Sequence, residues 1–457
     1  MPGTGHGSGG RVRFSQSGCT ATHRAFANGH VRRLTPDMVR RDCSGPIRVR
    51  WVRVLVVGSG GREHALAWKL AQSAAVEELH AAPGNPGIAK LGACHPIRAE
   101  DGESLLALAR TLGADLVVIG PEAPLVAGVA DELRRGGVAV FGPSAAAAQI
   151  EGSKGFAKDV MRAAGVPIAE TMSVARLPCV VKADGLAAGK GVFMCHTQDE
   201  LDEALVAVKA FGEQWVIEEL LEGEELSLFA LVDGLNVLPL PESRDYSRVG
   251  DDDTGPNTGG MGSYSPVPEL DEGQIAELVE TIHRPVVAEL AARGTPFIGC
   301  LYAGLMLTAD GPRVLEFNCR FGDPETQTIV PRIEGDLAEA LLAAATGDLG
   351  EVELGVAKSS AVTVVLAAGG YPESRDAGSA IEGLESAEAE GALVFHAGTA
   401  ARDGQLVTSG GRILNVIGVG DTLEQARARA YEACERISFP GARYRRDIAA
   451  KAVNVAG

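Results

Sequence analysis

The sequence predicts a multidomain α/β protein with an N-terminal doubly wound parallel-sheet domain, a central domain and a small C-terminal α+β domain. Its 457 residues are too many for one compact core. Strand and helix patterns alternate from residue 52 to about 150, which favours a parallel sheet. Residues 151–350 mix helices with strands that look antiparallel, and the remainder combines short strands with a helix at 423–437.

Composition restricts the partners of the protein. Its net charge of −18 argues against nucleic acid, because binding to phosphates needs clustered Lys and Arg. No apolar run reaches about eighteen residues, so the sequence predicts no membrane span. The 8 cysteines are scattered without a C-x-x-C pair, which favours reduced thiols over zinc or disulfides. We therefore expect a cytoplasmic protein whose main partner is not nucleic acid.

Residues 1–51 differ in composition from all that follows. The first fifty residues carry many arginines, few acidic residues and abundant Gly and Ser, without apolar periodicity. An Arg-rich, acid-poor leader could be a transit peptide, but this one lacks a clear amphipathic helix. We expect a disordered or non-native extension.

The N-terminal domain is expected to begin with a buried strand at Val52–Val57. A helix follows it. Further strands are predicted at Leu116–Gly120 and Val138–Phe141, with a helix at Val126–Arg135 between them. This alternation is the pattern of a doubly wound sheet.

A glycine-rich turn connects the first strand to its helix. A dinucleotide-binding fingerprint would place a third glycine where this chain has Glu63, so a nicotinamide cofactor is disfavoured. The backbone N–H groups of Gly60 and Gly61 open a helix, and Arg62 lies beside them. Such a group suits a phosphate monoester. The alternative is a tight strand-to-helix turn without a ligand.

A second glycine-rich loop, Lys182–Gly191, joins the predicted strands Cys179–Lys182 and Gly191–Cys195. It is not a Walker A loop, because no helix follows and the G-x-x-x-x-G-K-[ST] pattern is missing. Its small residues allow close approach of the backbone to phosphate oxygens, and Lys182 and Lys190 add positive charge. The loop is therefore predicted to close over a nucleoside triphosphate as a flap.

The central region contains side-chain oxygens that could bind a metal ion. Glu316 and Asn318 lie two apart on a strand and so share one face, which suits Mg²⁺, and Arg320 follows as a cation for a carboxylate or acyl phosphate. The alternative is a solvated strand end. The strand before the acidic turn at 218–225 can bind adenine through its backbone, although a surface hairpin would look similar. The polar loop Asp253–Gly262 is expected to be a binding element.

In this order the segments resemble an ATP-grasp ligase, and more narrowly the phosphoribosylamine–glycine ligase (glycinamide ribonucleotide synthetase) family. The likeness covers nearly all of residues 52–450. It is carried by the motifs GSGGREHALAWKL, APGNPG, GPEAPL, EGSKGFAKD, KADGLAAGKGV, EELLEGEE, GDDDTGPNTGGMG, LYAGLM, EFNCRFGDPETQ and AAGGYP. The expected domains are an N-terminal domain (52–151), an ATP-grasp domain (152–358) and a C-terminal α+β domain (359–457).

The resemblance implies a reaction that joins glycine to 5-phosphoribosylamine through a glycyl phosphate, with ATP and Mg²⁺ or Mn²⁺, by a monomer. It assigns ATP binding to Lys154, Lys182, Gly185, Gly189, Lys190, Gly191, Glu218, Leu221 and Glu225. It assigns substrate binding to Gly60, Gly61, Arg62, Gly259, Gly260, Met261 and Arg320. It assigns metal binding to Glu316 and Asn318, and catalytic roles to Arg320, Lys182 and Asp245.

Three features depart from the family pattern. One is the start of the chain: the family begins at a methionine that aligns with Val52, so we expect the native protein to begin there. The other two lie within the chain. The segment between Pro167 and Pro178 is shorter than is usual, and Ser247 stands where the family has a lysine. The shorter segment puts packing behind the flap in doubt, and Ser247 weakens one contact to an anion. One alternative is another ATP-grasp enzyme, such as a carboxylating or formate-using enzyme of purine metabolism. The other is a nucleotide- or phosphosugar-binding module that has lost its activity.

Overall fold

The N-terminal part forms one parallel sheet with helices around it. The computed structural model describes residues 51–185 and 191–456. The sheet has the order β3-β2-β1-β4-β5, and all its strands are parallel. Strands β2 and β3 are added on one side of β1, and β4 and β5 on the other. Its strands are β1 (Val52–Gly58), β2 (Val76–Pro83), β3 (Ala93–Cys94), β4 (Leu116–Ile119) and β5 (Val140–Phe141). Its helices are α1 (Gly61–Leu70), α2 (Gly102–Leu112), α3 (Glu122–Val126) and α4 (Val129–Arg135).

This topology places the first glycine loop at the switch point of the sheet, where open α/β sheets bind ligands. The doubly wound parallel sheet agrees with the sequence prediction. One detail differs: the helix predicted over Val126–Arg135 is interrupted. Gly128 has a φ of 90°, a left-handed conformation that ends α3 and lets α4 begin in a new direction.

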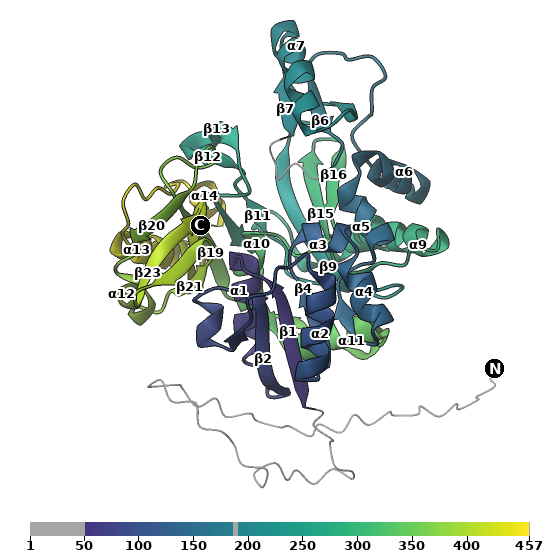
Figure 1. Cartoon of the computed structure of the whole chain (residues 1–457). Helices are drawn as coiled ribbons and strands as arrows, with labels where there is room; N and C mark the ends of the chain where they lie inside the picture. Colours follow the sequence, from purple (N-terminus) through teal and green to yellow (C-terminus); the bar gives the residue numbers. More distant parts are fainter. Residues whose placement is uncertain (1–50, 186–190, 457) are drawn as a thin grey trace, which may run out of the picture. The chain divides into compact units, whose positions relative to one another are not determined.

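The central region contains two antiparallel sheets joined to the first sheet by α5 (Ala145–Gly152) and α6 (Lys154–Ala164). A small sheet, β7-β6-β8, carries α7 (Gln198–Ala207) on one side (Figure 1). Its strands are β6 (Cys179–Ala183), β7 (Val192–Cys195) and β8 (Trp215–Glu219). The larger sheet, β10-β9-β15-β16, consists of β9 (Glu224–Asp233), β10 (Val237–Pro239), β15 (Ile298–Thr308) and β16 (Gly311–Asn318).

Helices cover the larger central sheet and complete its core. They are α8 (Glu272–Leu278), a π-helical turn (Val279–His283), α9 (Arg284–Ala292) and α11 (Leu337–Thr346). The short helix α10 (Glu325–Ile329) packs instead against α1 and against strands of the C-terminal sheet. No helix among residues 51–185 and 191–456 is both long and apolar enough to cross a membrane.

The C-terminal part has a five-stranded sheet of order β11-β14-β19-β24-β21. Its strands are β11 (Arg244–Asp245), β14 (Gly262–Ser265), β19 (Ser360–Ala367), β21 (Leu393–His396) and β24 (Arg412–Gly420). A three-stranded sheet, β20-β23-β22, lies beside it with β20 (Asp376–Ala380), β22 (Thr399–Arg402) and β23 (Gln405–Gly410). Its helices are α12 (Leu384–Ala389), α13 (Leu423–Arg436) and α14 (Ala450–Ala456).

Two strands of this C-terminal sheet come from the central part of the sequence. β11 pairs with β14, and β14 pairs with β19 with Ser265 opposite Ala361. The short hairpin β12 (Arg248–Gly250) and β13 (Thr254–Asn257) lies between them in the chain. The predicted binding loop Asp253–Gly262 is therefore held at its far end by the C-terminal sheet.

Candidate active site

Three lysines and two glutamates form the first part of the site. Ser153 is the N-cap of α6 and accepts a hydrogen bond from the N–H of Phe156. The first residue of the helix is therefore Lys154. Lys154 Nζ lies 2.5 Å from Glu316 Oε2. One turn later Lys158 Nζ lies 3.0 Å from Glu218 Oε1, and Lys182 Nζ lies 2.8 Å from the other oxygen of Glu218.

Glu316 pairs with Lys154 and lies within electrostatic range of two other predicted cations. The positive charge of Lys154 lowers the pKa of Glu316 to about 2, and Lys182 and Arg320 act in the same direction. The carboxylate is therefore ionised throughout the neutral range. The structure thus brings together three separate segments of the chain: α6 with Lys154, β6 with Lys182, and the end of β16 with Glu316 and the following Arg320.

A second group of carboxylates lies close to Glu316. Burial, followed by the charges of Glu325 and Glu225, raises the pKa of Asp245 well above its usual range. Desolvation of the carboxylate, followed by the negative charge of Glu316, raises the pKa of Glu225. Burial also raises the pKa of Glu325, which accepts a 2.8 Å hydrogen bond from Tyr302 Oη at Oε1. Because like charges oppose ionisation, this group would be stabilised by a bound cation.

The donor set fits a divalent cation that prefers oxygen. Glu316 is ionised, and the Oδ1 atom of Asn318 accepts only a long bond of 3.4 Å from Arg320. Glu325 Oε2 is buried without a hydrogen-bond partner. Among the residues that the structure describes, no three His, Cys, Asp or Glu side chains are arranged to hold a metal by themselves. An ion with few protein ligands, completed by phosphates and water, matches this arrangement.

Arg320 and Arg62 are joined through Glu122. Arg320 Nη2 lies 3.1 Å from Glu151 and its Nε lies 3.3 Å from Glu122. Arg62 Nη1 lies 3.8 Å from the same Glu122 oxygen, and Arg62 Nε lies 2.6 Å from Glu63. Both guanidinium groups are therefore engaged by carboxylates of the protein itself, next to the site.

Glu63 accounts for much of the first glycine loop. Its Oε2 atom accepts a 2.6 Å hydrogen bond from the N–H of Gly60, while Oε1 pairs with Arg62. A Cβ atom at Gly61 would overlap the amide of Asn415 and lie 2.7 Å from Gln327 Nε2. The loop thus satisfies one amide internally and packs closely on two other segments. The predicted contact of Arg62 with a sugar phosphate stays a prediction.

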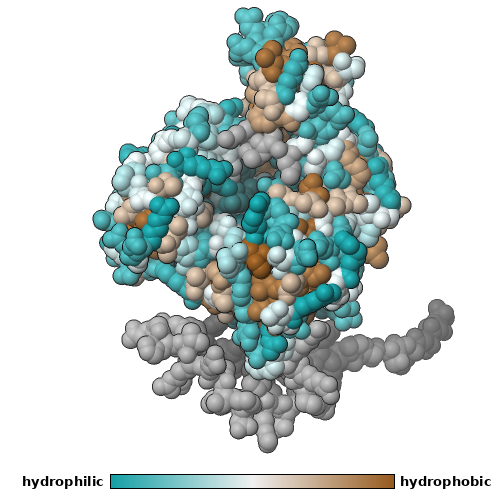
Figure 2. Space-filling model, in the orientation of Figure 1, coloured by the Kyte–Doolittle hydropathy of each residue, from teal (hydrophilic) through white to brown (hydrophobic). Residues whose placement is uncertain are grey.

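A pocket of about 530 Å³ lies beside this loop and is lined by all three parts of the chain. Figure 2 shows a hollow with hydrophilic walls in one face of the molecule. The lining residues are Ser59, Gly60, Pro83, Gly84, Asn85, Gly259, Asp323, Tyr371, Pro372, Arg375, Ala397, Gly398, Thr399, Ser409, Gly411 and Arg412. We call this pocket of about 530 Å³ the interdomain pocket.

Arg412, at the start of β24, holds the central loop against the interdomain pocket. Its Nη1 donates to the carbonyl oxygens of Gly259 and Asp323, and its Nη2 lies 2.8 Å from Asp323 Oδ2. Gly260 has a φ of 104°, and a Cβ atom there would collide with Pro324. The side chain of Met261 is fully buried in a small hydrophobic cluster, so only its backbone is near the site.

Asn85 connects the first glycine loop to the C-terminal sheet. Its Nδ2 donates 2.9 Å hydrogen bonds to the carbonyl oxygens of Ser59 and His396. Its Oδ1 accepts 2.9 Å bonds from the N–H groups of Gly87 and Ile88. All hydrogen-bonding positions of this amide are used, so its orientation is determined by the fold.

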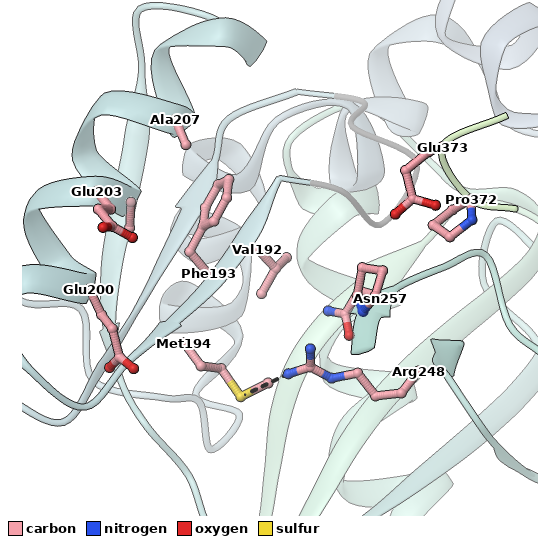
Figure 3. Close-up of a pocket in the computed structure, with 12 residues that line it drawn as sticks. Val192, Phe193, Met194, Glu200, Glu203, Ala207, Arg248, Asn257, Pro372 and Glu373 are labelled. Atoms are coloured by element: carbon pink, nitrogen blue, oxygen red, sulfur yellow. Dashed lines mark hydrogen bonds between the residues drawn. The ribbon is translucent and has the colours of Figure 1, made fainter. Parts of the chain in front are cut away.

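A second pocket, of about 550 Å³, lies between the small sheet and the β12–β13 hairpin. Figure 3 shows Val192, Phe193 and Met194 on one side and Arg248 and Asn257 on the other. The Arg248 guanidinium lies 4.0 Å from the sulfur of Met194. None of the predicted site residues is among the described residues that line this pocket.

The remaining predicted positions lie around the flap and its strands. Gly185 has a φ of 117° with open space around it, and the carbonyl of Gly191 accepts a 2.8 Å bond from Ala183. Leu221 follows β8 and is half-buried. Gly189, Lys190 and residues 1–50 of the predicted extension 1–51 lie outside the described residues.

Sequence reasoning missed four residues that shape the site. Lys158 lies four residues after Lys154 and so on the same helix face, a spacing that could have found it. Glu151, Asn85 and Arg412 act through partners far away in the chain, and no local pattern marks them.

The glycine flap strands, the paired lysines and the carboxylate cluster beside a parallel sheet are the parts of an ATP-grasp ligase. Family models of phosphoribosylglycinamide synthetase match the chain in three pieces: the N domain over 52–151, the ATP-grasp (A) domain over 152–326 and the C domain over 361–451. The chain belongs to the phosphoribosylglycinamide synthetase family.

Named relatives agree with the family models. A phosphoribosylamine–glycine ligase of Brucella melitensis is 49% identical over 426 residues, covering 88% of this chain and 98% of the relative. One from Streptomyces coelicolor is 49% identical over 417 residues, with coverage of 88% and 99%. The crystal structure of the Thermotoga maritima enzyme has a TM-score of 0.76 at 38% identity, covering 87% of this chain and 100% of that one.

More distant structures share the fold alone. A biotin carboxylase domain from Hydrogenobacter thermophilus has a TM-score of 0.65 at 19% identity. It covers 86% of this chain and 92% of that domain.

Proposed function

We propose that the protein joins glycine to 5-phosphoribosylamine, with conversion of ATP to ADP and phosphate, in de novo purine biosynthesis. The observation that carries this is the ion pair of Lys154 with Glu316, with Lys182 and Arg320 close enough to act on the same carboxylate, in a chain nearly half identical to ligases of that name. The product is glycinamide ribonucleotide, and the intermediate is glycyl phosphate.

The chemistry needs no covalent enzyme nucleophile. The glycine carboxylate attacks the γ-phosphorus of ATP and releases ADP, and the amine of phosphoribosylamine then displaces phosphate from the acyl carbon. Lys154 and Lys182 hold phosphate oxygens in place of their present carboxylate partners Glu316 and Glu218. Arg320 orients the carboxyl group. Rate enhancement comes from positioning and from neutralising charge in a site away from water.

We propose that Glu316 and Asn318 hold Mg²⁺ or Mn²⁺. The ion supplies neutralisation of phosphate charge when it is bound. A cation held there would also favour the ionised forms of Glu225, Asp245 and Glu325, whose pKa values are raised by burial and by neighbouring carboxylates. Asp245 is the proposed catalytic acid or base of this group.

The other proposed contacts divide between nucleotide and substrates. Adenine and ribose bind along the strand end at Glu218, Leu221 and Glu225, and Gly185–Gly191 closes over the phosphates. The first glycine loop and the Gly259–Met261 loop face the sugar. We further propose that the domains are 52–151, 152–358 and 359–457, and that the enzyme is a cytoplasmic monomer.

A coupled assay for ADP tests the function. Formation of ADP is expected only when glycine, phosphoribosylamine and a divalent cation are all present, and EDTA is expected to abolish it. Replacing glycine by formate or bicarbonate separates the ligase from other ATP-grasp enzymes. Release of ADP without either substrate, or none with both, would contradict the proposal.

A further inference from the structure

The interdomain pocket contains several hydrogen-bond donors, but most of them already have acceptors in the protein. The N–H of Gly60 donates to Glu63, and the N–H of Gly259 donates to Tyr371 Oη at 3.0 Å. The N–H groups of Gly398 and Thr399 donate to backbone carbonyls at 2.9 and 3.0 Å. These amides therefore shape the pocket and offer little to a charged ligand.

Arg412, one of the two arginines that line the interdomain pocket, also has acceptors in the protein already. Arg412 donates to the carbonyls of Gly259 and Asp323 and pairs with the carboxylate of Asp323. Since Asp323 is the only carboxylate among the described residues that line the pocket, the two charges cancel. Arg412 thus acts as a structural clamp with no charge left for a ligand.

The other arginine is Arg375, which differs in this respect. Its side chain is exposed, lines the interdomain pocket and makes no hydrogen bond or ion pair with any residue that the structure describes. The neighbouring acid is engaged elsewhere, because Asp376 accepts a 2.7 Å hydrogen bond from Thr408 Oγ1. The nearby Glu373 lines the other pocket (Figure 3). Arg375 therefore gives the interdomain pocket its unbalanced positive charge.

The backbone that carries Arg375 is well held. The N–H of Tyr371 donates to Ala368 at 3.0 Å, and the N–H of Ser374 donates to Gly370 at 2.7 Å. The hydroxyl of Tyr371 is fixed by the N–H of Gly259 and keeps its own proton to donate. The turn thus places a guanidinium and a hydroxyl at one wall of the pocket.

We propose that Arg375 binds the 5′-phosphate of the sugar substrate in the interdomain pocket and makes the enzyme prefer a phosphorylated ribosylamine. This inference rests on the proposed function. A phosphate monoester carries close to two negative charges, and a planar guanidinium can donate to two of its oxygens at once. Neutral hydroxyls of Tyr371 and Ser409 complete the site. The pocket is large enough for a pentose phosphate.

The test is the binding of ribose 5-phosphate and of ribose, measured by titration calorimetry on the full chain without nucleotide. In Arg375→Gln the dissociation constant for ribose 5-phosphate is expected to rise about tenfold to a hundredfold, the effect of losing a charged hydrogen bond. Binding of ribose should not change. Arg375→Lys keeps the positive charge but loses the planar guanidinium. Its dissociation constant for ribose 5-phosphate should lie between those of the wild type and of Arg375→Gln.

Arg402→Gln is the matched control. Arg402 is an exposed arginine at the end of β22 that lines neither pocket, so the variant makes the same change in charge and should bind like the wild type. In turnover, Arg375→Gln should raise KM for phosphoribosylamine while KM for ATP and for glycine stays constant.

Two results would overturn the role of Arg375. One is tight binding of ribose 5-phosphate by Arg375→Gln, and the other is a wild-type chain that binds ribose 5-phosphate no better than ribose. The proposed function fails separately, when the wild type binds ribose 5-phosphate but forms no ADP with glycine and phosphoribosylamine.

Discussion

Glu218 is the residue whose surroundings differ most from its expected role. It was predicted to contact the nucleotide base, yet its carboxylate is fully buried between Lys158 and Lys182. Burial lowers the pKa of Lys158 even with this partner present. Glu218 therefore compensates two buried lysines, one of which is a proposed phosphate ligand. Contact with adenine would have to come from its backbone.

Replacing Glu218 by Ala leaves both lysines buried without a counter-charge. We expect the free energy of unfolding to fall by about 3 kcal/mol, the usual cost of removing one partner from a buried pair. Urea denaturation at neutral pH measures it. Glu222→Ala, which removes an exposed carboxylate in the following turn, should have little effect. Equal stability of the two variants would show that the lysines are solvated.

At the scale of elements, the first glycine loop is mainly a packing device. Helix α1 starts against the amide side chains of Gln327 in α10 and Asn415 in β24, and Gly61 leaves room for both. Glu63 fixes the entry to the helix by accepting from the N–H of Gly60. The same residue stands where a dinucleotide fingerprint would need glycine, so the residue that stabilises the turn is also the one that departs from that fingerprint.

Gly61→Ala tests this packing. The added methyl group must displace Asn415, and we expect a loss of about 1–3 kcal/mol in the free energy of unfolding. Gly155→Ala in α6 is the matched control, since its Cβ would meet Asp184 at an ordinary 3.5 Å. It should be neutral or stabilising by up to about 1 kcal/mol. Thermal unfolding of both variants is the measurement, and equal melting temperatures would refute the packing role.

At the scale of the whole molecule, three histidines are buried in two separate places. His64 and His396 contact each other, with ring centroids 5.4 Å apart, and His283 lies apart from them in the central region. Burial lowers the pKa of His64 to about 3 and the pKa values of His283 and His396 to about 4. In the unfolded chain each would bind a proton near pH 6.5. Their contribution to stability is therefore complete above about pH 6.5 and is lost as the pH falls towards 4.

His283→Gln isolates one of these contributions. The stability advantage of the wild type over the variant should shrink by about 2 kcal/mol between pH 7.5 and pH 5, because only the wild type gains a proton on unfolding. Urea denaturation at the two pH values measures it. His196→Gln, at an exposed position, should follow the wild-type pH profile. A constant difference for His283→Gln would mean that the folded protein protonates this ring.

Patterns within short segments explain what could be predicted. The alternation after Val52 identified the parallel sheet, and the pair of strands around the flap was identified by its glycines. The entry of β11 and β14 into the C-terminal sheet was not foreseen. These strands have only 2 and 4 residues, too short for a period, and the partner β19 lies about a hundred residues later.

The same reasoning applies to the site. Lys154, Lys182, Glu316 and Arg320 belong to recognisable motifs, and the structure brings them together. Arg412 and Arg375 could not be singled out, because an arginine near a strand end carries no local signal of what it contacts. Their roles follow from which carboxylates and carbonyls are nearby, and that depends on tertiary contacts.

The clamp made by Arg412 has a consequence for biosynthesis of the chain. During translation the nucleotide-binding lysines emerge from the ribosome early, whereas the arginine that holds Gly259 and Asp323 emerges some ninety residues after the latter. A nascent chain can therefore assemble its ATP-binding elements long before it has a place for the sugar. Only a chain synthesised past β24 can combine the two, so the interdomain pocket is the last part of the site to be completed.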